Sequence, residues 1–460
     1  MEDRDVDIGQ ALENRRVGAF QALTLAFGCL ILFVDGLDYS AINVGAPSIL
    51  RAFGAERSAM GAVFGWGYFG IFVGSVLFGI IGDRYGRKPG LVLGVLAYSL
   101  PALFTGFASS LDELAVFRFL AGIGIGGVVP NVIALLTETA PKRLRVTFVM
   151  IAFVGYSTGN ATIAQAAAWA IPHFGWPIVF IIAGTLGTVL SIVLALFLPE
   201  SVLFLAETRP DSARLRRLAA RAAPELDIAS ATRIVVHRPS SETQFSLRLL
   251  FTSYRRIATP LLWIAFFAES LTFMTFSAWL AVILESAGLA PQQAALTFSY
   301  GAVGAMIAIL SVGRFIDKFG PRAGVVSALL AVSLIVYLGT AGLSPTVITI
   351  VAVCALASAS ATHQSLNGIV GGFYPTVIRG NGVGYATGTG RVAAILGPVI
   401  VGYLMAAHVP LRQVLFFIAA PDLIVAAACV GLDLLRRSPS ARADFTSLPA
   451  PVTRRSEQLA

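Results

Sequence analysis

Long apolar runs constrain this chain more than any other feature of its sequence. About 20 consecutive apolar residues are enough for a helix to cross a bilayer. Apolar residues make up 56% of the 460 positions and charged residues only 13%, which excludes an ordinary soluble domain and an intrinsically disordered chain. The runs lie at about 18–46, 58–81, 89–108, 112–137, 146–171, 176–198, 258–285, 292–316, 323–343, 346–373, 380–406 and 411–434. They predict an all-α membrane protein with twelve transmembrane helices.

A polar stretch in the middle of the chain divides these runs into two groups of six. Within it, residues 206–221 carry Leu215 and Leu218 among arginines, which predicts a short amphipathic helix at the inner membrane surface. The first residues are polar and have no apolar core, so we do not expect a cleavable signal peptide. The expected organisation is a tail at 1–17, a six-helix half at 18–198, a linker at 199–257, a second six-helix half at 258–435 and a tail at 436–460.

The distribution of Lys and Arg predicts how the chain crosses the membrane. If both termini are cytoplasmic, the loops on the opposite side hold only Arg51, Arg57 and Arg412, although the chain has 33 Lys and Arg residues. Basic residues concentrate on the cytoplasmic side of membrane proteins, so we expect both termini there and a place in the inner (plasma) membrane. The net charge of +8 then reflects topology, and we expect the lipid bilayer, not nucleic acid, as the partner.

An internal repeat links the two halves at one spacing of 234 positions. The loop segment Gly79–Lys88 has a counterpart in Gly313–Arg322, so that Asp83 corresponds to Asp317. The same spacing relates Asp35 in the first span to Glu269 in the seventh. A shared spacing of this kind indicates a duplicated six-helix unit. Such repeats place a binding site between the halves, near the bilayer midplane.

The sequence Gly-Asp-Arg-Tyr-Gly-Arg-Lys at 82–88 resembles the loop signature of the major facilitator superfamily, and the resemblance covers essentially the whole chain. More specific motifs resemble one branch, the aromatic acid:proton symporters, which include benzoate and hydroxybenzoate transporters. The motifs are Asp35-Gly-Leu-Asp38, Arg118-Phe-Leu-Ala-Gly-Ile-Gly-Ile-Gly-Gly, Pro199-Glu-Ser, Tyr374-Pro-Thr-Val-Ile-Arg379 and Gly390-Arg391. The resemblance implies the major facilitator fold and proton-coupled import of an aromatic carboxylate such as benzoate, hydroxybenzoate or a phenylpropionate.

Three departures from the branch pattern leave the exact substrate open. Leu37 and Tyr39 replace the residues usual in the first-span motif, and Trp279 is followed by Leu-Ala rather than Leu-Pro. Glu269 is not expected from the resemblance. Alternatives therefore stay open: a proton-coupled porter of sugars or other organic acids, a drug exporter, or a membrane receptor that binds without transport.

Ionisable groups within spans are costly and usually face a cavity or a partner. Asp35 and Asp38 share one helix face at i, i+3, and two such carboxylates in a low dielectric cannot easily both be ionised. We predict that they carry the transported proton, with Glu269 as a second candidate. The alternatives are that one aspartate caps a helix break at Gly36, or that one pairs permanently with Arg118.

Arg391, near the middle of the eleventh span, is the predicted ligand of the substrate carboxylate, because a guanidinium stays charged and can bind a carboxylate with two hydrogen bonds. Pairing with Glu269 or with Asp422 is the alternative, and we interpret Asp422 itself as structural. Arg118 is expected at the depth of the two aspartates. The other predicted substrate-binding residues are His363, Trp279, Tyr39 and Asn367, beside Arg118 and Arg391.

Charged residues at the cytoplasmic ends of spans are predicted to form pairs that close an inner gate when the halves rock. A merely topological role for these charges is the alternative. The predicted gate residues are Asp83, Arg84, Arg87, Glu138, Arg145, Asp317 and Lys318.

Two further motifs do not indicate an enzyme. Gly122–Gly127 fits G-x-G-x-x-G and Gly155–Gly159 fits the nucleophile elbow, but both lie inside predicted spans, where glycines allow helices to pack closely. The three cysteines lie in apolar runs and are interpreted as packing residues. The sequence has no phosphate-binding loop and no metal-ligand cluster. We therefore expect a non-enzymatic protein without cofactor. We also expect a monomer that uses the proton gradient as its energy source, and the number of protons per substrate stays open.

Overall fold

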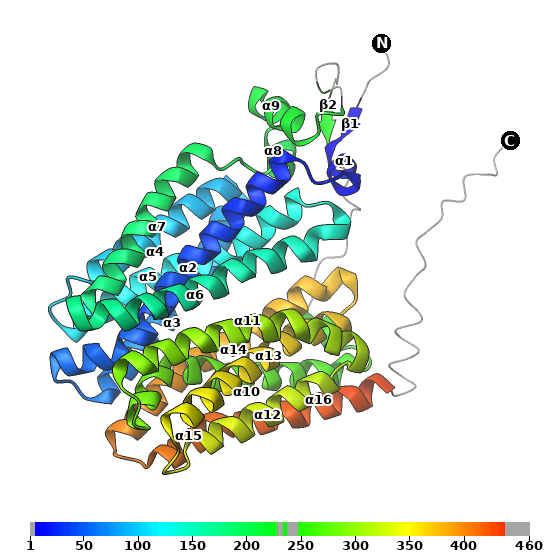
Figure 1. The fold of residues 1–460 in the computed structure, drawn as a ribbon. Coiled ribbons are helices and arrows are strands. Elements are labelled where there is room, and N and C mark those ends of the chain that lie inside the picture. The colour runs from blue at the N-terminus through cyan, green and yellow to red at the C-terminus, as the bar shows by residue number, and fades with distance from the viewer. Residues whose placement is uncertain (1–4, 227, 229–232, 237–246, 438–460) are drawn as a thin grey trace.

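A computed structural model describes residues 5–226, 228, 233–236 and 247–437, without the side chains of residues 5, 317, 376 and 377. In this part of the chain the protein is all-helical apart from one pair of short strands. Eleven helical segments in this part of the chain, with Leu411–Arg437 counted as one, are long and apolar enough to cross a membrane, and the shorter α12 (Arg322–Leu338) completes the expected set of spans. The N-terminal and C-terminal halves form two adjacent bundles (Figure 1).

The spans agree closely with the apolar runs. In the N-terminal half they are α2 (Ala19–Phe53), α3 (Arg57–Tyr85), α4 (Arg87–Thr105), α5 (Leu111–Thr139), α6 (Arg145–Phe174) and α7 (Pro177–Phe197). In the C-terminal half they are α10 (Arg255–Ser286), α11 (Pro291–Phe319), α12, α13 (Pro345–Phe373), α14 (Thr376–Ala406) and the pair α15 (Leu411–Ala419) and α16 (Pro421–Arg437).

The last span is broken, which the uninterrupted run expected at 411–434 did not predict. Helix α15 ends at Ala419 and α16 begins at Pro421. Proline has no backbone N–H to donate and is favoured in the first turn of a helix, so a new helix starts at this position. The break places Asp422 in the first turn of α16.

Glycines bring several helix backbones into direct contact, as the sequence predicted. A Cβ atom on Gly122 of α5 would lie 2.2 Å from the carbonyl oxygen of Gly67 in α3, and one on Gly124 would lie 2.3 Å from the backbone nitrogen of Tyr98 in α4. These distances are too short for any side chain. The glycines of the Gly122–Gly127 motif therefore serve helix packing.

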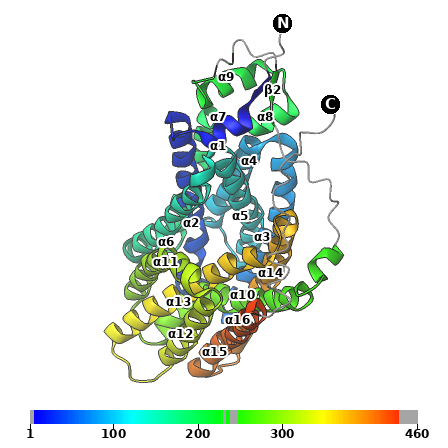
Figure 2. The same ribbon diagram turned by 90° about the vertical axis from the view of Figure 1, so that its right-hand side faces the viewer.

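The N-terminal tail and the linker fold together into what we call the terminal cap. It consists of β1 (Asp5–Asp7), α1 (Ile8–Asn14), α8 (Val202–Thr208), α9 (Ala213–Ala222) and β2 (Arg233–Val235), beside the short 3-10 helix η1 (Lys142–Leu144). Strands β1 and β2 pair in parallel, with Val6 opposite Ile234. Figure 2 shows the cap at one end of the N-terminal half.

The predicted amphipathic linker helix exists, but its apolar face packs inside the protein and not against lipid. Helix α9 buries Leu215, Ala219 and Ala222 in a small apolar core with Ile8 and Leu12 of α1. Its apolar face is therefore covered by the cap and is not available to lipid. The 3-10 helix η2 (Leu247–Phe251) leads from the linker into α10.

Candidate functional site

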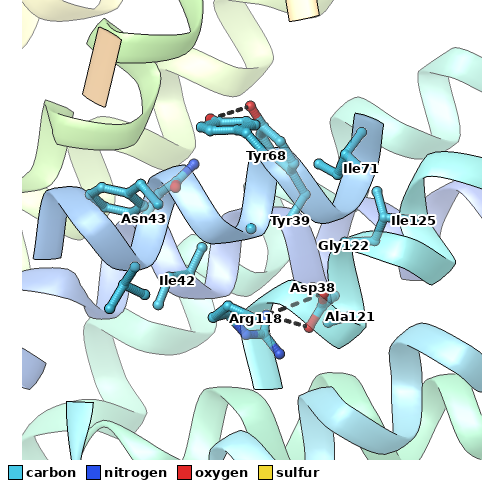
Figure 3. A pocket seen from close by; sticks show the side chains of 13 residues that line it. Asp38, Tyr39, Ile42, Asn43, Tyr68, Ile71, Arg118, Ala121, Gly122 and Ile125 are labelled. Carbon is cyan, nitrogen blue, oxygen red and sulfur yellow. Dashed lines mark hydrogen bonds and ion pairs between the residues drawn. The ribbon is translucent and has the colours of Figure 1, made fainter. Parts of the chain in front are cut away.

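In the N-terminal half, Asp38 and Arg118 form a buried ion pair. The Nη1 atom of Arg118 donates to the two carboxyl oxygens of Asp38 at 3.2 and 3.3 Å, and its Nη2 atom donates to the Thr105 hydroxyl at 2.8 Å. The guanidinium also lies over the ring of Phe180, 5.1 Å from its centroid. Figure 3 shows the ion pair between α2 and α5. In this conformation Arg118 is engaged by protein groups, not open to a substrate.

Asp35, one helical turn from Asp38, is in a different environment. It is 1% exposed, and neither of its carboxyl oxygens has a hydrogen-bond partner among the described residues. The phenol rings of Tyr39, Tyr98 and Tyr156 lie near enough to interact electrostatically with it. An unpaired carboxylate costs several kcal/mol in such a place, whereas a neutral acid does not. The surroundings of Asp35 therefore favour its protonated form.

Close helix packing fixes these two aspartates. A Cβ atom on Gly36 would lie 2.2 Å from the carbonyl oxygen of Tyr156 in α6, so α2 and α6 touch through their backbones at this level. Because the contact is rigid, Asp35 and Asp38 are held by the scaffold and not by a flexible loop. Helix α2 continues through Gly36, so the structure shows no helix break there for an aspartate to cap.

A small cavity adjoins the ion pair. Its volume is about 40 Å³, and it is lined by Asp38, Tyr39, Asn43, Tyr68 and Arg118 together with apolar residues of α2, α3 and α5 (Figure 3). A cavity that holds benzene has roughly 150 Å³. The space beside Asp38 thus suits water and not an aromatic substrate. The hydroxyl groups of Tyr39 and Tyr68 hydrogen-bond to each other at 3.1 Å at its edge.

In the C-terminal half, Glu269 and His363 pair with each other. Nδ1 of His363 lies 2.7 Å from Oε2 of Glu269, and the imidazole stacks on Phe273 with ring centroids 5.2 Å apart. The side-chain amide of Asn367 donates to the backbone carbonyl of His363 at 3.1 Å. The structure thus joins one predicted proton site with two predicted substrate-binding residues.

Arg391 remains without a protein counter-charge. It is half-buried in α14, and among the described residues no hydrogen bond or ion pair holds its guanidinium. Neither of the two residues considered as alternative partners pairs with Arg391. Glu269 pairs with His363, and the Asp422 oxygens have no hydrogen-bond partner in the described part of the chain. A guanidinium stays charged, so Arg391 can accept an external carboxylate.

Trp279 lies where the two halves touch. It is fully buried, its indole N–H donates to the carbonyl of Pro398 at 3.0 Å, and its ring meets the edge of Phe64 from the other half. In this conformation it is a packing residue with no face open to a substrate.

The predicted gate residues make contacts inside their own half. Arg87 binds Asp83 at 2.6 Å and Glu138 at 3.0 Å, while Arg145 binds Glu13 of the cap at 2.9 Å. Arg84 lies over Tyr85 and Lys318 over Phe319, and the side chain of Asp317 is outside the described residues. Among the described side chains, therefore, these charges do not join the halves at this end of the bundle in this conformation.

Glu200 belongs to this cluster but was not among the predicted gate residues. It is buried and accepts hydrogen bonds from the backbone N–H groups of Lys88 and Ser201 at 3.0 and 2.9 Å. Burial raises the pKa of Glu200 above its usual value, although these N–H groups act in the opposite direction. Gly86 has φ of 113°, and a Cβ atom there would lie 2.4 Å from the Glu200 carboxylate. Glu200 lies in the motif Pro199-Glu-Ser, which was noted only for the family resemblance and could have pointed to this residue.

The halves are joined at the middle and at the end opposite the cap. Arg51 of α2 forms an ion pair with Glu285 of α10, and Arg57 donates to the Ser286 hydroxyl at 3.2 Å. Nearer the middle, Ser299 of α11 donates to the carbonyl of Ala161 in α6 at 2.9 Å. Sequence reasoning missed the Arg51–Glu285 pair, although the two residues are related by the repeat spacing of 234 positions.

Breaking this pair should shift the balance between conformations. A single reversal, Glu285→Arg, replaces attraction by repulsion, and since exposed pairs contribute about 0.2–1 kcal/mol we expect an up to roughly fivefold shift toward states open at the Arg51 end. Spin labels at the exposed positions Ser109 and Ala290 would report a longer distance across that end. The double reversal Arg51→Glu/Glu285→Arg should restore the original distance; a failure to do so would rule out the ion pair as the cause.

Known proteins resemble this chain over nearly its whole length. A sequence profile described as Major Facilitator Superfamily matches residues 28–311 and 262–458. The gallate transporter of Pseudomonas putida is 31% identical over 444 residues, which cover 96% of this chain and 98% of the relative. The 3-(3-hydroxy-phenyl)propionate transporter of Escherichia coli is 30% identical, with 90% and 94% covered. The 4-hydroxybenzoate transporter of Acinetobacter baylyi is 28% identical, with 96% of each chain covered.

Solved structures share the fold. A bacterial homolog of the human lysosomal transporter Spinster superposes with a TM-score of 0.68 at 17% identity, over 92% of this chain and 98% of that chain. The xylose transporter XylE of E. coli gives a TM-score of 0.67 at 14% identity, over 94% and 98%. Together with the profile match and the two six-helix bundles, these similarities show that the chain belongs to the major facilitator superfamily and is a multi-pass membrane transporter, not an enzyme.

Proposed function

We propose that this transporter imports an aromatic carboxylate together with protons across the inner membrane, as a monomer that works by alternating access. The observation that carries the proposal is the guanidinium of Arg391, which lies in a membrane-spanning helix and has no hydrogen bond or ion pair with the described residues. A cation placed there without a counter-ion is costly unless a ligand neutralises it. The names of the relatives, which are carriers of gallate, 4-hydroxybenzoate and 3-(3-hydroxy-phenyl)propionate, support an aromatic acid as that ligand.

In this scheme substrate binding and proton binding are carried out by different residues. Arg391 binds the substrate carboxylate, and Tyr39, His363 and Asn367 contact its ring or its hydroxyl groups. Asp35 takes up a proton on the outside and releases it inside, because its unpartnered oxygens favour the neutral acid and opening to water favours the ion. The Asp38–Arg118 pair holds α2 and α5 together beside it.

The contacts between the halves indicate to which side of the membrane this conformation is open. With both termini in the cytoplasm, the Arg51–Glu285 end faces outward and is closed, and the cap end faces the cytoplasm. In this state Asp83, Arg87 and Glu138 pair within the N-terminal half, and they contact the other half when the inner side closes. This arrangement corresponds to an inward-open state of the cycle.

Uptake by proteoliposomes of the full-length protein tests the proposal. The panel holds benzoate, hydroxybenzoates, phenylpropionates, a sugar and a dicarboxylate, each measured with and without acid outside. Accumulation of one aromatic acid that depends on the pH gradient is the expected result. Gradient-driven uptake of the sugar or the dicarboxylate, with none of the aromatic acids entering, would replace the proposal by another porter function.

A further inference from the structure

The C-terminal half carries a buried carboxyl group that this scheme does not use. Asp422, in the first turn of α16, is 1% exposed, and neither of its carboxyl oxygens has a hydrogen-bond partner among the described residues. Leaving a charged carboxylate unpaired in such a place costs several kcal/mol. Asp422 therefore needs a proton in the conformation that the structure shows.

Within the part of the chain that the structure describes, the groups around Asp422 offer it no cation. The groups of α10 that act on Asp422 are the carboxylate of Glu269 and the hydroxyl of Thr272. The Thr272 hydroxyl donates its hydrogen to the backbone carbonyl of Ile418 at 2.9 Å. On its own helix the nearby titratable group is the buried thiol of Cys429. The charged residues of the neighbouring helices α12 and α15 lie elsewhere: Arg322 binds Asp433 at 3.0 Å, and Arg412 packs beside Gly339.

Glu269, which acts electrostatically on Asp422, pairs with a histidine that reaches accessible space. Oε2 of Glu269 is 2.7 Å from His363, while its Oε1 atom has no hydrogen-bond partner in the described structure. The His363 side chain is 24% exposed and that of Glu269 only 1%. The imidazole is thus accessible, Glu269 is a buried carboxylate with one oxygen that has no partner among the described residues, and Asp422, which Glu269 influences electrostatically, is fully buried.

We propose that Asp422 is a second proton-binding site of the transporter, loaded and unloaded through Glu269 and His363. The proton binds a carboxyl oxygen of Asp422 and leaves by way of Glu269 to the imidazole and then to water, so no other reactant is needed. The position of Asp422 in the first turn of α16 gives the charged form some support, because the N-terminal end of a helix favours an anion, although no backbone N–H among the described residues donates to its carboxyl group in this conformation. Asp422 can therefore exist in both protonation states, as a coupling site must.

The two halves then resemble each other in chemistry. Each half has one carboxylate paired with a basic residue, Asp38 with Arg118 and Glu269 with His363. Each also has one buried carboxyl group, Asp35 or Asp422, that forms no hydrogen bond with the described residues. If each lone carboxyl group carries one proton, a monoanion enters with two protons and one net positive charge moves inward. The membrane potential then contributes to uptake, by about 40-fold in the accumulation ratio per 100 mV. This consequence rests on the proposed function, whereas proton binding by Asp422 does not.

Infrared difference spectroscopy of the lipid-reconstituted protein tests proton binding without any substrate. We expect a C=O stretch of a protonated carboxylic acid that disappears as the pH rises and that Asp422→Asn removes. Cys429→Ala, a buried change on the same helix, should keep the band, and Asp422→Glu should keep it at a shifted frequency. Thermal unfolding shows whether each variant is folded. A spectrum that Asp422→Asn leaves unchanged would overturn the proposal; if that variant does not fold, an unshifted band in Asp422→Glu would do so.

Transport measurements then separate this proposal from the proposed function. At equal pH on both sides, an inside-negative potassium diffusion potential should drive uptake by the wild type but not by Asp422→Asn, which should still respond to a pH gradient. Wild-type uptake that follows the pH gradient but ignores the potential would refute the second proton and leave the proposed function intact. If no aromatic acid is taken up in a pH gradient, the proposed function fails, and the infrared spectra alone decide the role of Asp422.

Discussion

Proteoliposomes with Asp35→Asn should accumulate about tenfold less substrate per pH unit of gradient than the wild type, because one transported proton per cycle is worth about 1.4 kcal/mol per pH unit. Asparagine has the shape of the protonated aspartate but cannot release a proton. The surroundings of Asp35, with both carboxyl oxygens lacking a partner among the described residues, already suit the neutral form, so the variant should fold normally. Exchange of labelled for unlabelled substrate, which needs no net proton movement, should continue.

Asp38→Asn is the matched control, one helical turn away in the same helix. Here the change removes the counter-charge of a buried arginine, since Arg118 donates to both oxygens of Asp38. Leaving that guanidinium unpaired should destabilise the protein by about 3–5 kcal/mol, measured as a lower midpoint of thermal unfolding. If Asp35→Asn accumulated as much substrate as the wild type, the prediction for Asp35 would be contradicted. If Asp35→Asn and Asp38→Asn had equal unfolding midpoints, the distinction between the two residues would be contradicted.

The fold was largely predictable from the sequence because the bilayer restricts what can cross it. Each apolar run of sufficient length had to become a span, and the glycine motifs indicated where backbones touch. The exceptions involve residues that meet only in three dimensions. The cap joins Val6 to Ile234 and Ile8 to Leu215, and no periodicity in either segment indicates the other. The break before Pro421 was visible as a proline, but hydropathy alone does not show where a long apolar run divides.

The candidate site was predictable as a set of residues but not as a set of pairs. Ionisable residues in spans are conspicuous in any membrane protein, so Asp38, Arg118, Glu269, His363 and Arg391 were all identified. Depth along oppositely directed spans was enough to bring Asp38 and Arg118 together. It could not decide whether Glu269 meets Arg391 or His363, because that depends on how α10, α13 and α14 are rotated about their axes.

Replacing Arg391 should have a large effect on substrate binding, because no charged residue in the described part of the chain pairs with its guanidinium. Arg391→Gln should raise the substrate KM or Kd by roughly 10- to 100-fold, since hydrogen bonds to charged groups contribute about 1.5–3 kcal/mol. Arg391→Lys should recover only part of this loss, because an ammonium keeps the charge but not the two parallel hydrogen bonds of a guanidinium. Binding of a labelled substrate to detergent-solubilised protein measures both variants.

Two controls distinguish carboxylate recognition from a general loss of structure. Arg322→Gln removes an arginine that binds Asp433 at the cap end of the C-terminal half, so substrate affinity should stay close to that of the wild type. A neutral carboxamide analogue of the substrate should bind weakly to the wild type and equally weakly to Arg391→Gln, because the lost interaction needs both charges. If Arg391→Gln weakened the acid and the amide by the same factor, Arg391 would shape the site without binding the carboxylate. The family resemblance would then stand, but the anion would need another cation, and Arg118 could serve only after leaving Asp38.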